Sequence, residues 1–270
     1  MTAAGRRAFV KAVSAAQNSM SPAVHRQEIV VARSLPKAAS SPALLGSYDD
    51  GDWVALVLAD VDGRHPVTPW ESSELALVLA MLDRLSACGV PAELAQLPSL
   101  ASEIAGDLAG WEHLRAERPP ALDPWAADHL DLLVGLASAG TAALTADTLV
   151  HADTRADNLL ISASGDVTLV DWPWACLGPV WLDTVALLVN VNLYGGHDVE
   201  ALLATATLQG QPLLAYAPGD AITGFLAGLT GFFLNVARLP DPPGLPTVRA
   251  FQQAQGDATL SWLRRRLEAS

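Results

Sequence analysis

Oxygen-bearing side chains interrupt an otherwise apolar stretch between residues 149 and 174. Asp153 and Asn158 lie in a loop that leads into the apolar segment NLLISA, which begins at Asn158, and Asp171 lies near the end of the segment DVTLVDW. A Ser-Gly turn joins the two segments, which predicts a β-hairpin. Antiparallel pairing would bring Asn158 and Asp171 together, and such oxygen ligands suit Mg²⁺, which keeps other positions for water and substrate phosphates. The pattern therefore predicts a magnesium site, with Asp153 close enough to hold a hydroxyl group.

Lysine is rare in this chain, because only two of its 16 Lys and Arg residues are Lys. One of them, Lys11, lies in the apolar run AFVKAV, within a strand predicted over residues 7–15. A lysine on a strand acts as a compact point charge when it is aimed at a phosphate.

The hydrophobic pattern predicts an α+β fold in two parts. Strands are expected at 7–15 and 53–61, with a helix over 25–35 between them that carries Glu28. Together they predict a small strand-rich lobe over residues 1–62. Residues 63–270 are expected to form a mostly helical lobe with the hairpin embedded in it, and a ligand would bind in the cleft between the lobes.

Helix signals recur through the second part. Thr68 as a cap, Pro69 at the first helical position and Glu71 completing a capping box predict a helix that starts there. Further helices are expected near residues 99–117, 123–138, 179–194, 198–208, 219–236 and 246–268. Trp172, Trp174 and Trp181 are expected to pack in the core, although one of them could face a substrate.

Charge and composition narrow the function. The net charge is -13, yet residues 1–40 carry six Lys and Arg against one Glu, so the rest of the chain carries -18. This argues against nucleic acid and is compatible with a cationic small molecule, or with a merely soluble acidic surface. Two Cys cannot form a disulfide framework or a cysteine-based zinc site.

Membrane insertion and secretion are not expected. The N-terminal residues lack a signal-peptide pattern, which favours a cytoplasmic protein. The longest apolar stretch, residues 221–236, is shorter than the roughly 20 residues that span a bilayer and is predicted to be a buried helix.

The order of these residues resembles a known family. His151-x-Asp153-x-x-x-x-Asn158, followed by Asp171, resembles the catalytic loop and metal-binding aspartate of the protein-kinase-like superfamily. Ala152 between the His and the Asp, and Trp172 after Asp171, are similar to the aminoglycoside phosphotransferase family within it. The resemblance extends to GPVWLDTVALL downstream and to FVKAV and LVLADVDG upstream, so it covers residues 9 to about 190.

The resemblance implies a protein-kinase-like two-lobe fold and a role for each matching residue. Asp153 would orient the acceptor hydroxyl and take its proton, and Arg155 would stabilise charge on the transferring phosphoryl group. Asn158 and Asp171 would hold Mg²⁺. The remaining roles are phosphate binding by Lys11, positioned by Glu28; backbone contacts to adenine from Ala59 and Val61; structural support by His151; and bracing of the catalytic loop by Asp183.

The function that the resemblance implies is phosphoryl transfer from ATP or GTP to a hydroxyl of a small molecule, such as an aminoglycoside or another amine-bearing acceptor. Only ten residues precede Lys11, too few for the two strands and phosphate-covering loop that the superfamily places there. A nucleotide-binding pseudokinase with a regulatory role is therefore the alternative. A metal-dependent hydrolase is disfavoured because the other five His show no ligand spacing. The acceptor, the choice of nucleotide and the oligomeric state stay open.

Overall fold

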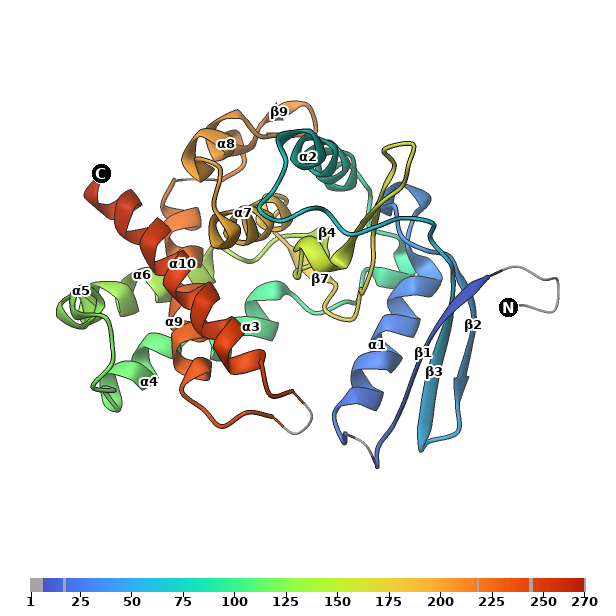
Figure 1. Cartoon of the computed structure of the whole chain (residues 1–270), viewed down its shortest axis with the longest axis horizontal. Coiled ribbons are helices and arrows are strands. Elements are labelled where there is room, and N and C mark those ends of the chain that lie inside the picture. The colour runs from blue at the N-terminus through green and yellow to red at the C-terminus, as the bar shows by residue number, and fades with distance from the viewer. Residues whose placement is uncertain (1–6, 17, 218, 243–244, 270) are drawn as a thin grey trace.

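The computed structural model describes residues 7–269 except 17, 218, 243 and 244. A three-stranded antiparallel sheet with one long helix forms the N-terminal part, and the rest of the chain is mostly helical (Figure 1). The predicted α+β class is confirmed. The expectation of a shortened segment before the lysine strand rests mainly on residues 1–6, which lie outside the described residues.

The sheet has the order β1-β3-β2, formed by β1 (Ala8–Ser14), β3 (Trp53–Ala59) and β2 (Leu44–Asp49). On β3, alternate side chains are buried and pack against Ile29 of α1 (Ser21–Ser34). The sequence pattern did not predict β2, because most of its side chains are exposed and a register shift near Gly46 interrupts the pairing. The sheet therefore packs against α1 through the face that carries the buried side chains of β3.

The register of β1 decides where its lysine points. Lys11 is paired with Leu56, one of the buried residues of β3 that face α1. Directly paired residues in an antiparallel sheet project to the same face. Lys11 is therefore directed to the side of the sheet where α1 lies.

The segment after β3 joins the sheet to the hairpin. Arg64 and Ile161 exchange two backbone hydrogen bonds, at 3.0 and 2.7 Å. His65 Nδ1 lies 2.9 Å from the Leu159 carbonyl. A Cβ on Gly63 would lie 3.2 Å from the Ile161 carbonyl oxygen, so glycine permits this close approach. The connector is thereby fixed along the strand that follows the catalytic loop.

The predicted helix start at Thr68 is wrong. Helix α2 spans Ser72–Ser86 with Glu71 at its N-cap and no side-chain capping bond. The carboxylate that organises this region is Glu74, which accepts the Val67 N–H at 2.8 Å and pairs with Arg64. These contacts hold the preceding segment extended across the first turn, so the helix begins later than the capping pattern suggests.

Other predicted helices are present with changed bounds. The helix expected over 99–117 is divided into α3 (Leu100–Leu108) and α4 (Gly110–Ala116), and the one over 123–138 into α5 (Pro124–Asp128) and α6 (Leu130–Ala142). Near their predicted places lie α7 (Leu182–Tyr194), α8 (Val199–Thr205), α9 (Gly219–Ala237) and α10 (Val248–Glu268). Short 3₁₀ helices are η1 (Lys37–Ala39), η2 (Ala92–Leu94), η3 (Ala156–Asn158) and η4 (Leu213–Ala215).

The predicted hairpin is confirmed as β5 (Leu159–Ile161) paired with β6 (Val167–Leu169). Two further pairs were not predicted: β4 (Thr148–Val150) with β7 (Cys176–Gly178), and β8 (Thr207–Leu208) with β9 (Gln211–Pro212). Unlike β5 and β6, the strands β4 and β7 are far apart in the sequence, so no turn signal marks their pairing.

Helix α9 lies at the centre of the helical part, in contact with α3, α4, α6 and α10 (Figure 1). Glycines let its neighbours approach closely: a Cβ on Gly140 would lie 2.2 Å from the Gly224 carbonyl carbon, and one on Gly110 would lie 2.2 Å from the Gly231 oxygen. By length and composition α9 could cross a membrane, yet 61% of its most apolar window is buried inside the protein. The expectation of a buried helix is confirmed.

Candidate active site

The predicted catalytic loop, residues 151–158, runs from the end of β4 to the start of β5 and is hydrogen-bonded to α7. Asp183, in the first turn of α7, accepts the backbone N–H groups of His151 and Ala152, each at 2.9 Å. The Thr154 hydroxyl donates to the same carboxylate at 3.1 Å. Ala152 has a positive φ of 65°, which the two hydrogen bonds at this turn help to hold. The expected bracing by Asp183 is confirmed.

His151 is fully buried and has a structural place in the loop. Its Nδ1 accepts the Asp153 N–H at 3.2 Å, and its Nε2 lies 3.0 Å from the Val170 carbonyl. A neutral ring with the proton on Nε2 satisfies both contacts. The ring also packs edge-on against Trp172, with 4.7 Å between ring centroids. His151 thereby connects the loop to the segment that leads to Asp171.

Asp153 and Asn158 are joined directly. The Asn158 Nδ2 donates to the Asp153 backbone carbonyl at 2.8 Å and to its Oδ2 at 3.0 Å. Burial raises the pKa of Asp153 above its ordinary value of 3.8, although the Arg155 charge and the Asn158 hydrogen bond act in the opposite direction. A carboxylate with a raised pKa is a stronger base, which suits a group that must accept a proton.

The hairpin places Asp171 beside Asn158. Leu159 pairs with Leu169, and the Val170 N–H donates to the Asn158 carbonyl at 2.9 Å. Asp171 follows immediately, with a left-handed φ of 67° that turns the chain away from the strand. The predicted proximity of Asn158 and Asp171 thus follows from the register of β5 and β6.

Lys11 reaches across from the sheet to this end of the hairpin. Its Nζ lies 2.8 Å from Glu28 Oε1, 2.9 Å from Glu28 Oε2 and 2.5 Å from Asp171 Oδ1. Burial alone would lower the pKa of Lys11, but hydrogen bonds to Asp171 and Glu28 outweigh it, so the pKa is raised above 10.5. The ammonium is therefore charged at neutral pH, and the expected pairing of Lys11 with Glu28 is present.

Arg155 extends the charged cluster on the far side of Asp153. Its Nη2 lies 3.5 Å from Asp153 Oδ2 and its Nε lies 2.9 Å from Asp157 Oδ1. The contact with Asp157 lacks hydrogen-bond geometry, so the buried Nε has no hydrogen-bond partner among the described residues. The guanidinium also lies 5.9 Å from the ring centroid of Phe251 on α10. Arg155 is thus held beside the predicted base by ion pairs with Asp153 and Asp157.

The predicted adenine contacts lie where β3 ends. The Ala59 N–H donates to the Ala43 carbonyl at 2.8 Å, and the Val61 carbonyl accepts the Gly63 N–H at 3.1 Å. One backbone group of each residue is therefore engaged within the protein. Contacts to adenine would have to use the Ala59 carbonyl and the Val61 N–H.

The residues at the hairpin end fit a magnesium ion that is shared with substrate. The donor set is one carboxylate, Asp171, and the amide oxygen of Asn158, whose nitrogen is already occupied by Asp153. Within the described part of the chain, no three His, Cys, Asp or Glu side chains are grouped to hold a metal. Mg²⁺ at phosphoryl-transfer sites takes one or two protein ligands and completes its shell with phosphates and water.

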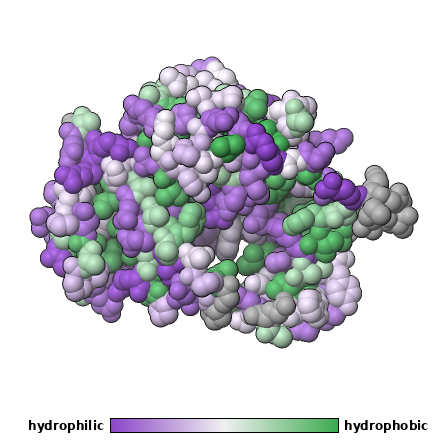
Figure 2. Space-filling model, viewed as in Figure 1, coloured by the Kyte–Doolittle hydropathy of each residue, from purple (hydrophilic) through white to green (hydrophobic). Residues whose placement is uncertain are grey.

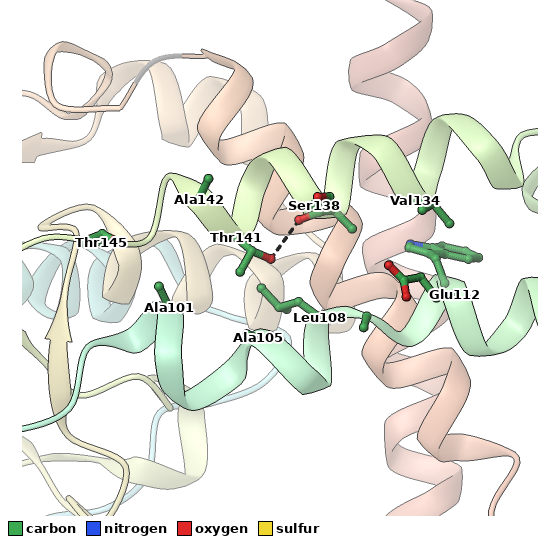
Figure 3. A pocket seen from close by; sticks show the side chains of 12 residues that line it. Ala101, Ala105, Leu108, Glu112, Val134, Ser138, Thr141, Ala142 and Thr145 are labelled. Carbon is green, nitrogen blue, oxygen red and sulfur yellow. Dashed lines mark hydrogen bonds between the residues drawn. The ribbon is translucent and has the colours of Figure 1, made fainter.

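Surface shape agrees with a site between the two parts. The space-filling view is hollowed between the sheet and the helical part (Figure 2). A separate cavity of about 410 Å³ lies between α3, α4 and α6, with Glu112, Ser138 and Thr141 among its lining residues (Figure 3). Its lining comes entirely from residues 101–145, so it is distinct from the catalytic loop.

The three tryptophans that follow Asp171 in the sequence differ in their exposure to solvent. Trp172 and Trp181 are buried as expected. Trp174 is 56% exposed, so the expectation of core packing is wrong for it. The aromatic pattern alone could not distinguish the exposed Trp174 from the buried Trp172. The chain turns directly after Trp172, so the two side chains point to different environments.

The fold and these residues together define a protein of the protein-kinase-like class. The family model described as "Phosphotransferase enzyme family" matches residues 2–220, and the chain belongs to that family. A search of curated protein sequences gave no match.

Solved structures show the same fold. An aminoglycoside phosphotransferase from Alicyclobacillus acidocaldarius aligns at 18% identity with a TM-score of 0.58, covering 99% of this chain and 89% of that one. The choline kinase LicA from Streptococcus pneumoniae aligns at 12% identity with a TM-score of 0.62, covering 100% and 88%. Aminoglycoside phosphotransferase APH(4)-Ia, as a thermostable mutant in a ternary complex with ADP and hygromycin B, aligns at 15% identity with a TM-score of 0.58, covering 96% and 87%.

Sequence reasoning missed one group of the site. Asn190, on α7, accepts the backbone N–H of Ala156 in the catalytic loop. A signal was available, because Asn190 lies seven residues after Asp183 in the apolar segment LDTVALLVN, which places both on one helix face.

Proposed function

We propose that this protein transfers the γ-phosphoryl group of ATP or GTP to a hydroxyl group of a small molecule. Family membership supports a small-molecule phosphotransferase. The observation that carries the finer proposal is the meeting of Lys11 and Asp171, which brings the predicted phosphate-binding lysine to the predicted magnesium ligand. We also propose that residues 1–62 act as the nucleotide lobe and residues 63–270 as the catalytic and acceptor lobe.

The reaction needs little covalent chemistry from the protein. The acceptor oxygen attacks the γ-phosphorus, the bond from that phosphorus to the β-γ bridging oxygen breaks, and the hydroxyl proton passes to the Asp153 carboxylate. The raised pKa of Asp153, caused chiefly by burial, favours this proton transfer. Arg155 would stabilise charge on the transferring group, and Lys11 would bind the α- and β-phosphates. Mg²⁺ held by Asn158 and Asp171 would neutralise charge on the phosphates.

An amine-bearing alcohol is the proposed acceptor. Residues 41–270 carry a net charge of -18, which follows from -13 for the chain and +5 for residues 1–40. An acidic surface of this kind raises the local concentration of a cation. Hygromycin B in one structural neighbour is consistent with this choice, as is the choline kinase activity named for another. A cytoplasmic location, without nucleic-acid or membrane partners, remains the accompanying prediction.

The first test is thermal melting with and without Mg-ATP and Mg-GTP. We expect a rise in melting temperature that requires magnesium and is lost in Asp171→Asn. Asp166→Asn is the matched control, because Asp166 is an exposed aspartate at the opposite end of the same hairpin. No rise with either nucleotide in the wild-type protein would overturn the nucleotide site.

The second test is phosphate transfer to a panel of aminoglycosides and choline, followed by mass spectrometry of the acceptor. An increase of one phosphate in acceptor mass that depends on Asp153 supports the enzyme. Nucleotide-dependent stabilisation without transfer to any acceptor, including water, would identify the pseudokinase instead.

A further inference from the structure

Helix α7 presents two buried polar side chains to the catalytic loop. Asp183 and Asn190 are 5% and 4% exposed, in a helix whose other buried side chains are almost all apolar. Seven residues separate them, which is close to two turns, so both lie on the same face. A buried polar group needs a hydrogen-bond partner, and each of these two side chains has at least one partner in the catalytic loop.

The two side chains hold the loop at two points. Asp183 holds its beginning through the backbone of His151 and Ala152. Asn190 Oδ1 accepts the Ala156 N–H at 3.3 Å. Ala156 is the first residue of η3, the short turn that ends at Asn158. The contacts therefore lie on either side of Asp153, and the second lies at the start of the turn that presents Asn158.

The Asn190 oxygen is itself fixed by a second donor. The Trp70 Nε1–H donates to it at 3.2 Å, and Trp70 is buried. The Trp70 carbonyl lies 2.8 Å from His197 Nε2, so the segment before α2 and the segment before α8 are joined at this point. Asn190 thus connects the catalytic loop to the buried Trp70 in the segment before α2.

We infer that Asn190 is a positioning residue for the magnesium site. It touches neither metal nor substrate, and it acts through Ala156 to fix the turn that carries Asn158. The predicted effect on Mg²⁺ affinity rests on the proposed function. The hydrogen bond from Ala156 to Asn190 is present without nucleotide or metal, so the bracing of the loop can be tested independently. Removing groups that orient a metal ligand commonly lowers metal affinity by about 10- to 100-fold.

The chain offers a matched control on the same helix. Asn192 is also an asparagine with both ends of its amide engaged: its Nδ2 donates to the Ala258 carbonyl at 2.6 Å, and its Oδ1 accepts from Arg265 at 3.0 Å. Both partners lie on α10, and neither belongs to the catalytic loop. Asn192→Ala therefore removes two side-chain hydrogen bonds from α7 without removing any bond to the loop.

The experiment compares Asn190→Ala with Asn192→Ala in the full chain. Hydrogen exchange of the peptide containing Ala156 is measured without nucleotide, and thermal melting with ATP is then titrated with Mg²⁺. We expect faster exchange around Ala156 and about a 10-fold higher Mg²⁺ requirement in Asn190→Ala only. Equal exchange and an equal Mg²⁺ midpoint in the two variants, after correction for stability, would overturn the inference.

Two further variants keep the test decisive if Asn190→Ala does not fold. Asn190→Leu fills the same volume but removes the acceptor, so it should reproduce the faster exchange and the higher Mg²⁺ requirement. Asn190→Asp keeps an acceptor oxygen and should stay near the wild type in both. A folded Asn190→Leu with wild-type behaviour overturns the inference. A wild-type protein without any nucleotide response contradicts the proposed function alone, because the exchange measurement still tests the bracing.

Discussion

Lys11 Nζ lies 2.5 Å from Asp171 Oδ1, although 160 residues separate them in the sequence. One comes from the N-terminal sheet and the other from the end of the catalytic hairpin. Glu28, which is 3% exposed, completes the cluster from α1. One cation thus pairs with two carboxylates at the junction of the sheet and the helical part, which leaves the three-residue cluster with one negative charge in excess.

Replacing Lys11 by Met should remove nucleotide binding and destabilise the protein. The change leaves the buried Glu28 carboxylate without its cation, and removing one partner of a fully buried pair costs about 3–5 kcal/mol. Because the Lys11 side chain is 20% exposed, we expect a loss of about 3 kcal/mol at most. Urea unfolding and nucleotide-dependent melting measure the two effects.

The double variant Lys11→Met/Glu28→Gln separates stability from function. It should recover part of the lost free energy of unfolding, because the unpaired charge is gone, without recovering nucleotide binding. Lys37→Met is the control, since Lys37 is the other lysine of the chain and is exposed. Recovery of nucleotide binding by the double variant would contradict the role of Lys11.

Asp153→Asn should inactivate the enzyme and stabilise the free protein. Burial raises the pKa of Asp153 above 3.8, so its ionised form is disfavoured in the folded state. Its contribution to stability is therefore present below the ordinary carboxyl pKa and is lost as pH rises through the folded pKa. At neutral pH the neutral amide should raise the melting temperature, while transfer falls by about 10²-fold or more.

Melting curves at acidic and neutral pH test the sign of this effect. The gain from Asp153→Asn should be larger at neutral pH than near pH 4, where the wild-type carboxyl approaches protonation. A variant that is less stable than wild type at neutral pH would show that the hydrogen bond with Asn158 outweighs the burial of charge.

The acid limb of the pH–rate profile should report the ionisation of Asp153. Substitution of its two charged neighbours, Arg155 and Asp157, should move this limb in opposite directions. The rate should fall as pH falls through the raised pKa of Asp153, because only the ionised form accepts a proton. Arg155 lowers this pKa and Asp157 raises it. Arg155→Gln should therefore move the limb to higher pH, and Asp157→Asn should move it to lower pH.

The profile is measured as kcat/KM at saturating magnesium, so that the position of the limb is separated from the loss of rate that Arg155→Gln also causes. Movement of both limbs in the same direction would assign the ionisation to another group.

Two glycines of α6 should respond oppositely to alanine. A Cβ at Gly140 would lie 2.2 Å from backbone of α9, whereas one at Gly135 meets nothing within 4 Å. Gly140→Ala should destabilise by about 1–3 kcal/mol or more, because two helix backbones must separate. Gly135→Ala should stabilise by about 0.4–1 kcal/mol through loss of backbone freedom in the unfolded chain. Chemical denaturation of both variants provides the comparison, and a stable Gly140→Ala would show that the crossing of α6 and α9 is loosely packed.

The sequence predicted the position of an element correctly where a cap or a turn within that element marks it. Asp123 caps α5 and Asp198 caps α8, and both helices begin close to the predicted starts at residues 123 and 198. The turn at Gly165 closes the predicted hairpin. The sequence was insufficient where a distant contact decides the outcome. The break between α3 and α4 coincides with the close approach of Gly110 to Gly231. Helix α2 begins later than the capping pattern predicts, because Glu74 binds Arg64 and the Val67 N–H and so holds the preceding segment extended.

The candidate site divides in the same way. The spacing of Asp153, Asn158 and Asp171 was enough to predict that they share one end of a hairpin, because spacing and antiparallel register are local properties. Three features of the site depend instead on long-range packing: the contact of Lys11 with Asp171, the exposure of Trp174 beside the buried Trp172, and the support of the catalytic loop by Asn190. These facts depend on how the sheet, the hairpin and α7 pack together, and packing between elements far apart in the chain is not encoded in the periodicity of any one of them.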